Sequence, residues 1–95
     1  MKNNIPLISV IIPAYNEEKC ITECLNSLKN QQFKDFELIV IDNNSKDSTS
    51  KIAKQYTKKV FLCKEQGISS ARNFGAKKAK GKILCFIDAD GIVSS

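Results

Sequence analysis

The sequence predicts an α/β fold with a mostly parallel sheet, in the order β-α-β-α-β-α-β. Three observations support this. Short runs of β-branched and other apolar residues alternate along the chain with stretches that carry apolar residues at helical spacing. Right-handed crossovers between such strands produce a parallel sheet. The length of 95 residues, with 42% hydrophobic and 26% charged residues, fits one compact domain.

The expected strands are four apolar runs, at residues 7–12 (LISVII), 36–41 (FELIVI), 60–63 (VFLC) and 82–87 (KILCFI). The first run lies between Pro6 and Pro13 and is rich in β-branched residues. Such continuous apolar runs are typical of strands that are covered on both faces in a parallel sheet. The last run leads directly into Asp88 and is also expected to be buried.

Helical patterns fill the intervals between these runs. The first expected helix has Asn16 as its N-cap, and Glu17 and Glu18 lie in its first turn, where the helix dipole favours negative charge. Its apolar stripe consists of Ile21, Cys24, Leu25 and Leu28. Asp47 or Ser48 can cap the second helix, whose inward residues are Ile52, Ala53 and Tyr56.

The third expected helix spans residues 68–80 and follows Gly67. Its inward face consists of the small residues Ala71, Gly75 and Ala79. Small residues let a helix backbone approach its neighbour closely. This helix is therefore expected to pack tightly against the sheet.

Composition excludes several kinds of chemistry. The chain contains no histidine, which rules out a Ser-His-Asp triad, a Cys-His pair and any zinc site that needs imidazole. The four cysteines form no CxxC pair and are expected to be buried, reduced thiols of a cytoplasmic protein. The first apolar run is too short to span a membrane. Membrane association is expected only through C-terminal regions of a longer protein.

The net charge of +5 raises the possibility of a basic nucleic-acid-binding module. The lysines are scattered, however, with short pairs such as Lys58-Lys59 and Lys77-Lys78, and the chain has no RNA-binding aromatic motif. No nucleic-acid partner is therefore expected. A solvated lysine face that could touch acidic lipid in the intact protein is the favoured interpretation.

Polar residues gather after three of the expected strands, at residues 13–17 (PAYNE), 42–45 (DNNS) and 88–90 (DAD). Parallel strands bring their carboxyl ends to one edge of the sheet, where ligands of such folds bind. Turn chemistry alone would explain Asn44 and Ser45 equally well. The sequence therefore predicts that the three clusters converge on one site.

Asp88 and Asp90 stand two residues apart and repel each other unless a cation lies nearby. Mg²⁺ or Mn²⁺ typically joins one or two carboxylates to substrate phosphates. For two other side chains the sequence leaves two alternatives each. Tyr15 either stacks on a base or packs half-buried, and Arg72 either contacts a phosphate or is solvated on its helix.

The residues 8–18 (ISVIIPAYNEE), 40–49 (VIDNNSKDST) and 67–76 (GISSARNFGA), continuing to 86–90 (FIDAD), together resemble the family 2 glycosyltransferases. The likeness runs from about Ile8 to Gly91. It implies the GT-A fold, whose nucleotide-binding half is Rossmann-like, and an inverting, metal-dependent transferase that takes a nucleotide-diphosphate sugar, expected to be a UDP-sugar. Residues 1–95 would be one domain, the truncated N-terminal donor-binding part of such an enzyme, and the acceptor is unknown.

The resemblance also implies roles for individual residues. Pro13, Tyr15 and Glu17 match positions that line the nucleoside pocket. Asp42 matches an acid that holds the base, and Asn43, which replaces a second acid, can still accept a hydrogen bond from the base. Arg72 matches a position near the diphosphate. Asp88 and Asp90 match the motif that binds metal and ribose, and Asp90 is the expected direct ligand of Mn²⁺ or Mg²⁺.

No residue of the chain matches the catalytic base, which is expected beyond Ser95, so the chain is expected to be inactive alone. The alternative function is a non-catalytic nucleotide-binding or receiver-like signalling module, which also gathers acids at strand ends around Mg²⁺. A receiver needs an acid pair after its first strand, and here Pro13, Ala14 and Tyr15 occupy that place.

Overall fold

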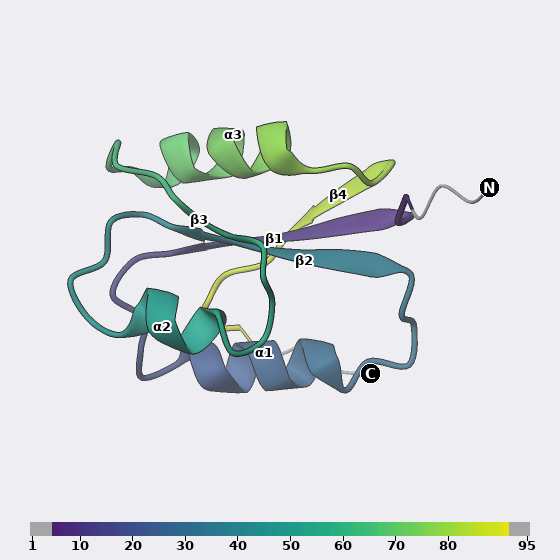
Figure 1. Cartoon of the computed structure of the whole chain (residues 1–95), viewed down its shortest axis with the longest axis horizontal. Coiled ribbons are helices and arrows are strands. Elements are labelled where there is room, and N and C mark those ends of the chain that lie inside the picture. Colours follow the sequence, from purple (N-terminus) through teal and green to yellow (C-terminus); the bar gives the residue numbers. More distant parts are fainter. Residues whose placement is uncertain (1–4, 92–95) are drawn as a thin grey trace.

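The computed structural model describes residues 5–91, which form one parallel sheet between two layers of helices (Figure 1). The elements in chain order are β1 (Ile8–Ala14), α1 (Ile21–Lys29), β2 (Phe36–Asp42), α2 (Thr49–Ala53), β3 (Val60–Leu62), α3 (Ile68–Lys78) and β4 (Ile83–Phe86). This confirms the predicted α/β class and element order. Within the described residues, no helix has the length and apolar character needed to cross a membrane.

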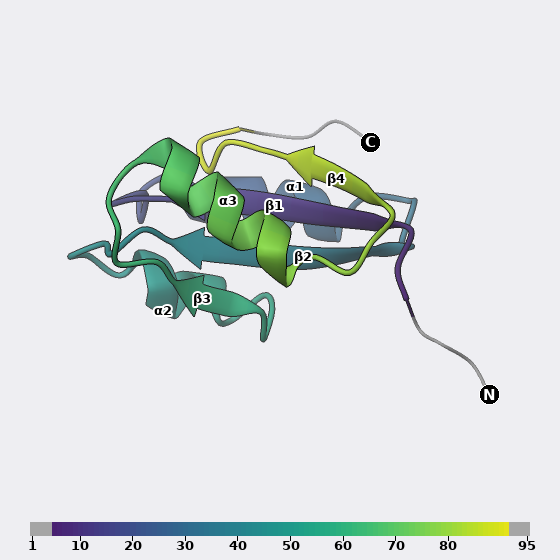
Figure 2. The same ribbon diagram turned by 90° about the horizontal axis from the view of Figure 1, so that it is seen from above.

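The strands are all parallel and lie in the order β3-β2-β1-β4 (Figure 2). Side chains alternate across the two faces of the sheet. Val10 and Ile12 of β1 belong to the core under α1 and α2, and Ile11 packs with Ile39 and Ile41 of β2 in the core under α3. The central strands β1 and β2 are therefore covered on both faces, as the apolar runs predicted.

The prediction that the fourth strand is buried is wrong. All four residues of β4 are exposed, because β4 lies at the edge of the sheet that residues 5–91 form and α3 packs across β1 and β2. The expectation of four buried cysteines fails with it. Cys24 and Cys63 are buried, Cys20 is half-buried, and Cys85 on β4 is exposed. All four thiols are free.

The helix boundaries differ from the prediction at two places. Helix α1 begins at Ile21 after Cys20, so Asn16 is not its N-cap and its first-turn acid is Glu23. Asn16 instead adopts a left-handed conformation with φ 53°. Helix α3 ends at Lys78, because the next residue is extended. The N-cap of α2 is Ser48, one of the two predicted candidates.

Gly75 shows how closely α3 approaches the sheet. A Cβ placed on it would overlap Ile11 Cγ2 and lie 3.1 Å from Ile41 Cγ1, and both isoleucines are fully buried. Gly75→Ala should therefore lower the free energy of unfolding by about 1–2 kcal/mol, since the cost of overpacking exceeds the gain of about 1 kcal/mol in helix propensity. Urea denaturation followed by circular dichroism measures this.

Asn73→Ala is the matched control, because Asn73 is exposed on the same helix. Removing its side chain adds helix propensity and creates no overlap. We expect it to raise stability by up to about 0.7 kcal/mol. Stabilisation of both variants would contradict the close packing of α3.

Candidate functional site

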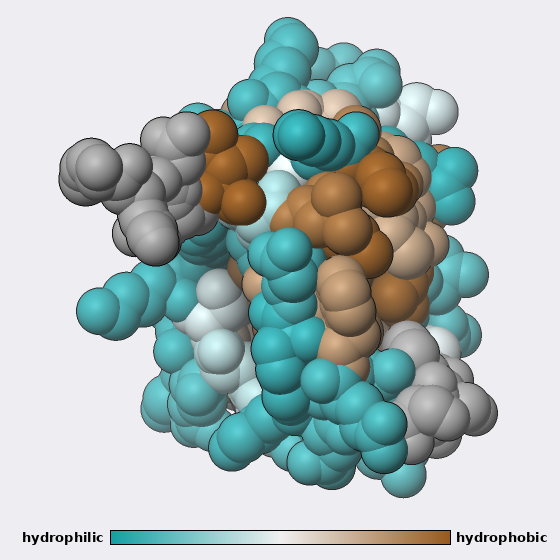
Figure 3. Space-filling view, turned by 90° about the vertical axis from the view of Figure 1, so that its right-hand side faces the viewer, coloured by the Kyte–Doolittle hydropathy of each residue, from teal (hydrophilic) through white to brown (hydrophobic). Residues whose placement is uncertain are grey.

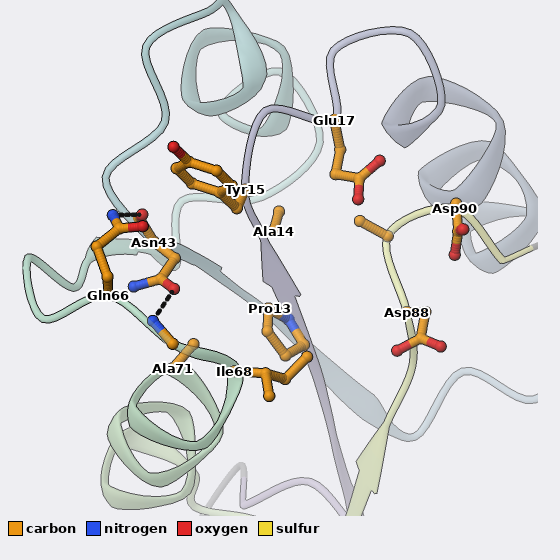
Figure 4. Close-up of a pocket in the computed structure, with 12 residues that line it drawn as sticks. Pro13, Ala14, Tyr15, Glu17, Asn43, Gln66, Ile68, Ala71, Asp88 and Asp90 are labelled. Carbon is orange, nitrogen blue, oxygen red and sulfur yellow. Dashed lines mark hydrogen bonds between the residues drawn. The ribbon is translucent and has the colours of Figure 1, made fainter.

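A pocket of about 390 Å³ opens at the carboxyl ends of β1 and β4, beside the start of α3 (Figure 4). Its walls come from all three parts of the chain in which the sequence analysis found polar clusters. The lining residues are Pro13, Ala14, Tyr15, Glu17, Asn43, Gln66, Gly67, Ile68, Ala71, Asp88, Ala89 and Asp90. The predicted convergence of the clusters is therefore observed.

Hydrogen bonds join the loop after β1 to the loop after β2. The backbone N–H of Asn16 donates to Ser45 Oγ at 2.8 Å, and the N–H of Lys46 donates to Asn16 Oδ1 at 2.8 Å. The Glu17 N–H donates to Thr49 Oγ1 at 2.8 Å. Asn16 thus forms hydrogen bonds with the loop after β2 and does not cap helix α1. These contacts fix the backbone on either side of the pocket residues Tyr15 and Glu17.

Asn43 holds the wall opposite the acids. Its Nδ2 donates to the carbonyl oxygens of Cys63 at 3.1 Å and Glu65 at 2.8 Å, and its Oδ1 accepts the Gly67 N–H at 3.0 Å. Gln66 Nε2 donates to the Asn43 carbonyl at 2.7 Å. Both hydrogens of the Asn43 amide are therefore used within the chain. Its side chain fixes the loop between β3 and α3, including Gly67 with φ 122°.

Three carboxylates occupy the other side of the pocket. Glu17 follows β1, and Asp88 and Asp90 follow β4, so that the three side chains share one wall (Figure 4). Burial raises the pKa of Glu17, and the negative charges of Asp90, Asp47 and Asp88 raise it further. The pocket therefore carries concentrated negative charge, which favours a cation.

The acidic wall fits a divalent cation that shares its ligands with a substrate. Within residues 5–91 no group of three or more His, Cys, Asp or Glu side chains is arranged as a metal site. Mg²⁺, however, is usually held by one or two carboxylates together with substrate phosphates. Asp88 and Asp90 supply such a pair. Both are exposed, so phosphates and water could complete the coordination.

Cys24 lies beneath this wall and does not act as a nucleophile. Its Sγ donates to the Asp88 carbonyl at 3.6 Å. Burial raises the pKa of the Cys24 thiol to about 11, and the charges of Asp90 and Asp88 contribute. The thiol therefore stays protonated near neutral pH, and nucleophilic cysteine chemistry needs the thiolate.

Two residues that the resemblance assigns to the donor lie outside the pocket lining. Asp42 is buried at the end of β2, where its Oδ1 accepts the Ser45 N–H at 3.0 Å. Arg72 projects from α3 with its Cζ 5.8 Å from the centroid of the Phe86 ring. The remaining predicted residues all line the pocket: Pro13, Tyr15, Glu17, Asn43, Asp88 and Asp90.

Part of the pocket lining was not predicted from the sequence. Ile68 is 56% exposed. Gln66 and Ile68 flank Gly67, which was predicted only as the residue before the third helix, and all three line the pocket. The sequence signal that would have identified Gln66 and Ile68 is their position on either side of Gly67, which precedes α3. Together with Tyr15, which is 44% exposed, Ile68 gives the pocket an apolar part beside its acidic wall.

The fold and this pocket define an α/β domain with an acidic pocket at the carboxyl ends of its parallel strands. Residues 9–95 match the family Glycosyl transferase family 2. The match covers most of the chain, and the chain therefore belongs to that family, as its motifs predicted.

Relatives with a curated name agree with this assignment. The chain is 42% identical over 96 residues to the uncharacterized glycosyltransferase EpsJ of Bacillus subtilis, covering 96% of this chain and 28% of EpsJ. It is 38% identical to the glycosyltransferase AglE of Haloferax volcanii, covering 95% of this chain and 32% of AglE. The chain thus spans about a third or less of each relative.

Solved structures show the same fold. The structure of TarS 1-349 of S. aureus in complex with UDP-GlcNAc superposes with a TM-score of 0.82 at 38% identity, covering 92% of this chain and 27% of that one. The mannosyltransferase PcManGT of Pyrobaculum calidifontis, in complex with GDP-Man and Mn²⁺, gives a TM-score of 0.84 at 27% identity, with coverage of 95% and 29%. Both neighbours are glycosyltransferases by name, because TarS is named a poly(ribitol-phosphate) beta-N-acetylglucosaminyltransferase and PcManGT a mannosyltransferase.

Proposed function

We propose that this chain is the donor-binding part of an inverting glycosyltransferase that uses a UDP-sugar and Mn²⁺ or Mg²⁺. The observation that carries the proposal is the pocket itself, which combines an exposed aromatic ring, a hydrogen-bonded loop and a pair of exposed carboxylates. The UDP-GlcNAc complex of TarS and the Mn²⁺ complex of PcManGT support the donor and the metal.

Each wall of the pocket has a role in this proposal. Tyr15 offers an aromatic face on which the base stacks, and Pro13 lines the same pocket. The Asn43 side chain, through its hydrogen bonds to the backbone of Cys63, Glu65 and Gly67, holds the loop before α3 in the position at which the nucleoside would contact it. A bound metal would neutralise the diphosphate as it leaves. Asp88 and Asp90 would hold that metal, and Asp90 would be its direct ligand.

The acceptor side of the reaction is proposed to lie in other parts of a longer protein. In an inverting transfer, a base deprotonates the acceptor hydroxyl, which displaces the diphosphate from the opposite side of the anomeric carbon. Within residues 5–91, the acids that line the pocket are those already proposed for the nucleoside and the metal. We therefore expect the chain to bind the donor without transferring the sugar.

Titration calorimetry with UDP, with and without Mn²⁺, tests this proposal. UDP should bind appreciably only in the presence of Mn²⁺. Asp90→Asn should weaken binding about tenfold or more, because it removes a charged metal ligand. Asp35→Asn is the matched control, since Asp35 is exposed before β2, at the opposite end of the sheet. Equal affinity with and without Mn²⁺, unchanged in Asp90→Asn, would overturn the metal-dependent site.

A further inference from the structure

The two residues that the resemblance assigns to the nucleobase are engaged in contacts within the chain. Asp42 lies outside the pocket lining, and its Oδ1 accepts the Ser45 N–H. Asn43 is 5% exposed, and its amide donates two hydrogen bonds to the loop before α3 and accepts one from it. Neither side chain therefore offers the free donor and acceptor that would distinguish one base from another.

Gln66 is an exposed polar side chain on the same wall. It lines the pocket together with Asn43 and Tyr15, on the side away from the acidic wall (Figure 4). Its Nε2 donates to the Asn43 carbonyl at 2.7 Å, which is the one hydrogen bond that this amide makes within the described part of the chain. The second Nε2 hydrogen and the Oε1 acceptor are therefore free to bind a ligand.

The contact with Asn43 decides which end of the Gln66 amide is the donor. A side-chain amide can turn by 180° and exchange its oxygen and nitrogen with little change in shape. The carbonyl oxygen of Asn43 is only an acceptor, so the Nε2 end of Gln66 must face it. With this end fixed, Gln66 presents one N–H donor and one C=O acceptor, side by side, to the pocket.

The backbone of Gln66 is also held on both sides. Asn43 Nδ2 donates to the carbonyl of the preceding residue, Glu65, and Asn43 Oδ1 accepts the N–H of the following residue, Gly67. Asn43 thus orients both the main chain and the side chain of Gln66. A group that is held in place before its ligand arrives loses less conformational entropy on binding.

We infer that Gln66 is the specificity-determining residue that selects uracil over cytosine in the donor, an inference that rests on the proposed function. Uracil has an N3–H donor between two carbonyl acceptors, O2 and O4. Its N3–H can donate to Gln66 Oε1 while a neighbouring carbonyl accepts the remaining Nε2 hydrogen. Two paired hydrogen bonds of this kind discriminate between bases more sharply than a single one.

Cytosine does not match the oriented amide. Its N3 is an acceptor, which would oppose Gln66 Oε1, and the contact with Asn43 prevents the amide from turning to present a donor there. The Tyr15 ring does not discriminate between the two pyrimidines, because every base has a face that can stack on an aromatic ring. The native chain should therefore bind UDP about tenfold more tightly than CDP.

Gln66→Ala tests the inference by titration calorimetry with UDP and CDP in the presence of Mn²⁺. The affinity for UDP should fall about tenfold, because two hydrogen bonds to the base are lost, and the affinity for CDP should change by less than about twofold. Gln32→Ala is the matched control, because Gln32 is exposed in the loop before β2. That loop lies at the end of the sheet where the strands begin, opposite the pocket, which is the end that faces the viewer in Figure 3.

Inorganic pyrophosphate separates base recognition from a general effect on the pocket. It has a diphosphate group and no base, so Gln66→Ala should bind it in the presence of Mn²⁺ as tightly as the native chain does. Equal losses of affinity for UDP and pyrophosphate would show that Gln66 acts through the loop and would overturn the inference. Mn²⁺-dependent UDP binding that Gln66→Ala leaves unchanged would overturn the inference alone, whereas a native chain that binds neither compound would overturn the proposed function as well.

Gln66→Glu should change the preferred base. A carboxylate has two acceptors and no donor. It matches the adjacent N1–H and N2–H donors of guanine, whereas one of its oxygens opposes a carbonyl of uracil. The added negative charge repels the diphosphate of every nucleotide alike, so the ratio of the affinities for UDP and GDP reports the base. We expect this ratio to fall at least about tenfold from its native value, and a ratio that stays at its native value would contradict base recognition by Gln66.

Discussion

Replacing Glu37 with glutamine should lower the free energy of unfolding by roughly 3 kcal/mol at pH 7. Glu37 is only 7% exposed on β2, and its carboxylate accepts three hydrogen bonds. The donors are Ser9 Oγ on β1, Lys59 Nζ before β3 and the backbone N–H of Lys80 after α3. One carboxylate therefore ties three segments to the end of the sheet opposite the pocket.

The magnitude follows from the pKa of Glu37. Burial raises this pKa, but the hydrogen bonds from Lys59, Ser9 and Lys80, with the charge of Lys59, outweigh burial and hold it at about 2, below the ordinary 4.5. One unit of pKa is worth about 1.4 kcal/mol. Because the folded state lowers the pKa, the stabilisation is complete above about pH 4.5 and is lost as the pH falls toward 2.

Urea denaturation at pH 7, 4 and 3 measures how much free energy of unfolding Glu37→Gln loses and how that loss depends on pH. The stability of the native chain should fall over this range more steeply than that of Glu37→Gln, which has no carboxylate to protonate at this position. Glu23→Gln is the matched control, because Glu23 is exposed on α1, and it should change stability by less than about 0.5 kcal/mol. Parallel pH profiles for the native chain and Glu37→Gln would contradict this account.

The central part of the fold was predictable from local sequence. The β-branched runs of β1 and β2 are apolar at nearly every position, and the structure buries them on both faces. The small inward residues Ala71 and Gly75 likewise predicted the close contact of α3 with the sheet, and both are buried. In these elements burial decides the conformation, and the pattern of apolar residues records burial directly.

The predictions that failed concern contacts between distant segments. Asn16 has the side chain of a good N-cap, but its hydrogen bonds go to Ser45 and Lys46, which are far away in the sequence. The residues of β4 are as apolar as those of β1, and only the strand order places β4 at the edge of the sheet within residues 5–91. The order of apolar and polar residues along the chain does not specify hydrogen bonds between distant segments or the order of strands in a sheet.

The residues of the candidate site likewise divide into those that the local sequence predicts and those that depend on contacts between distant segments. The acids after β4 and the tyrosine after β1 were predictable, because parallel strands end at one edge of the sheet. The function of Asn43 was not predictable, since its partners Cys63, Glu65 and Gly67 lie some 20 residues further along the chain. Asp42 and Arg72 carry motif signals, yet their side chains contact Ser45 and Phe86 in this structure rather than the pocket.

Asn43→Ala should lower the free energy of unfolding by about 2–3 kcal/mol. The substitution removes three hydrogen bonds from a side chain that is 5% exposed, and it leaves the Cys63 carbonyl without its amide donor in a buried region. The loop that Asn43 holds forms one wall of the pocket. The same variant should therefore also weaken binding of UDP in the presence of Mn²⁺, although the acidic wall is unchanged.

Asn43→Asp, compared with Asn43→Ala, tests whether Asn43 acts by holding the loop or by contacting the base. Aspartate keeps the acceptor for the Gly67 N–H but loses both donors, and it places a carboxylate against the carbonyls of Cys63 and Glu65. If Asn43 acts by holding the loop, Asn43→Asp should destabilise the fold at least as much as Asn43→Ala, and both should weaken UDP binding. If Asn43 instead acts by contacting the base, both variants should keep native stability while UDP affinity falls. Denaturation and calorimetry on the same samples distinguish these outcomes, because only a loop that has lost its hydrogen bonds links lower stability to weaker binding.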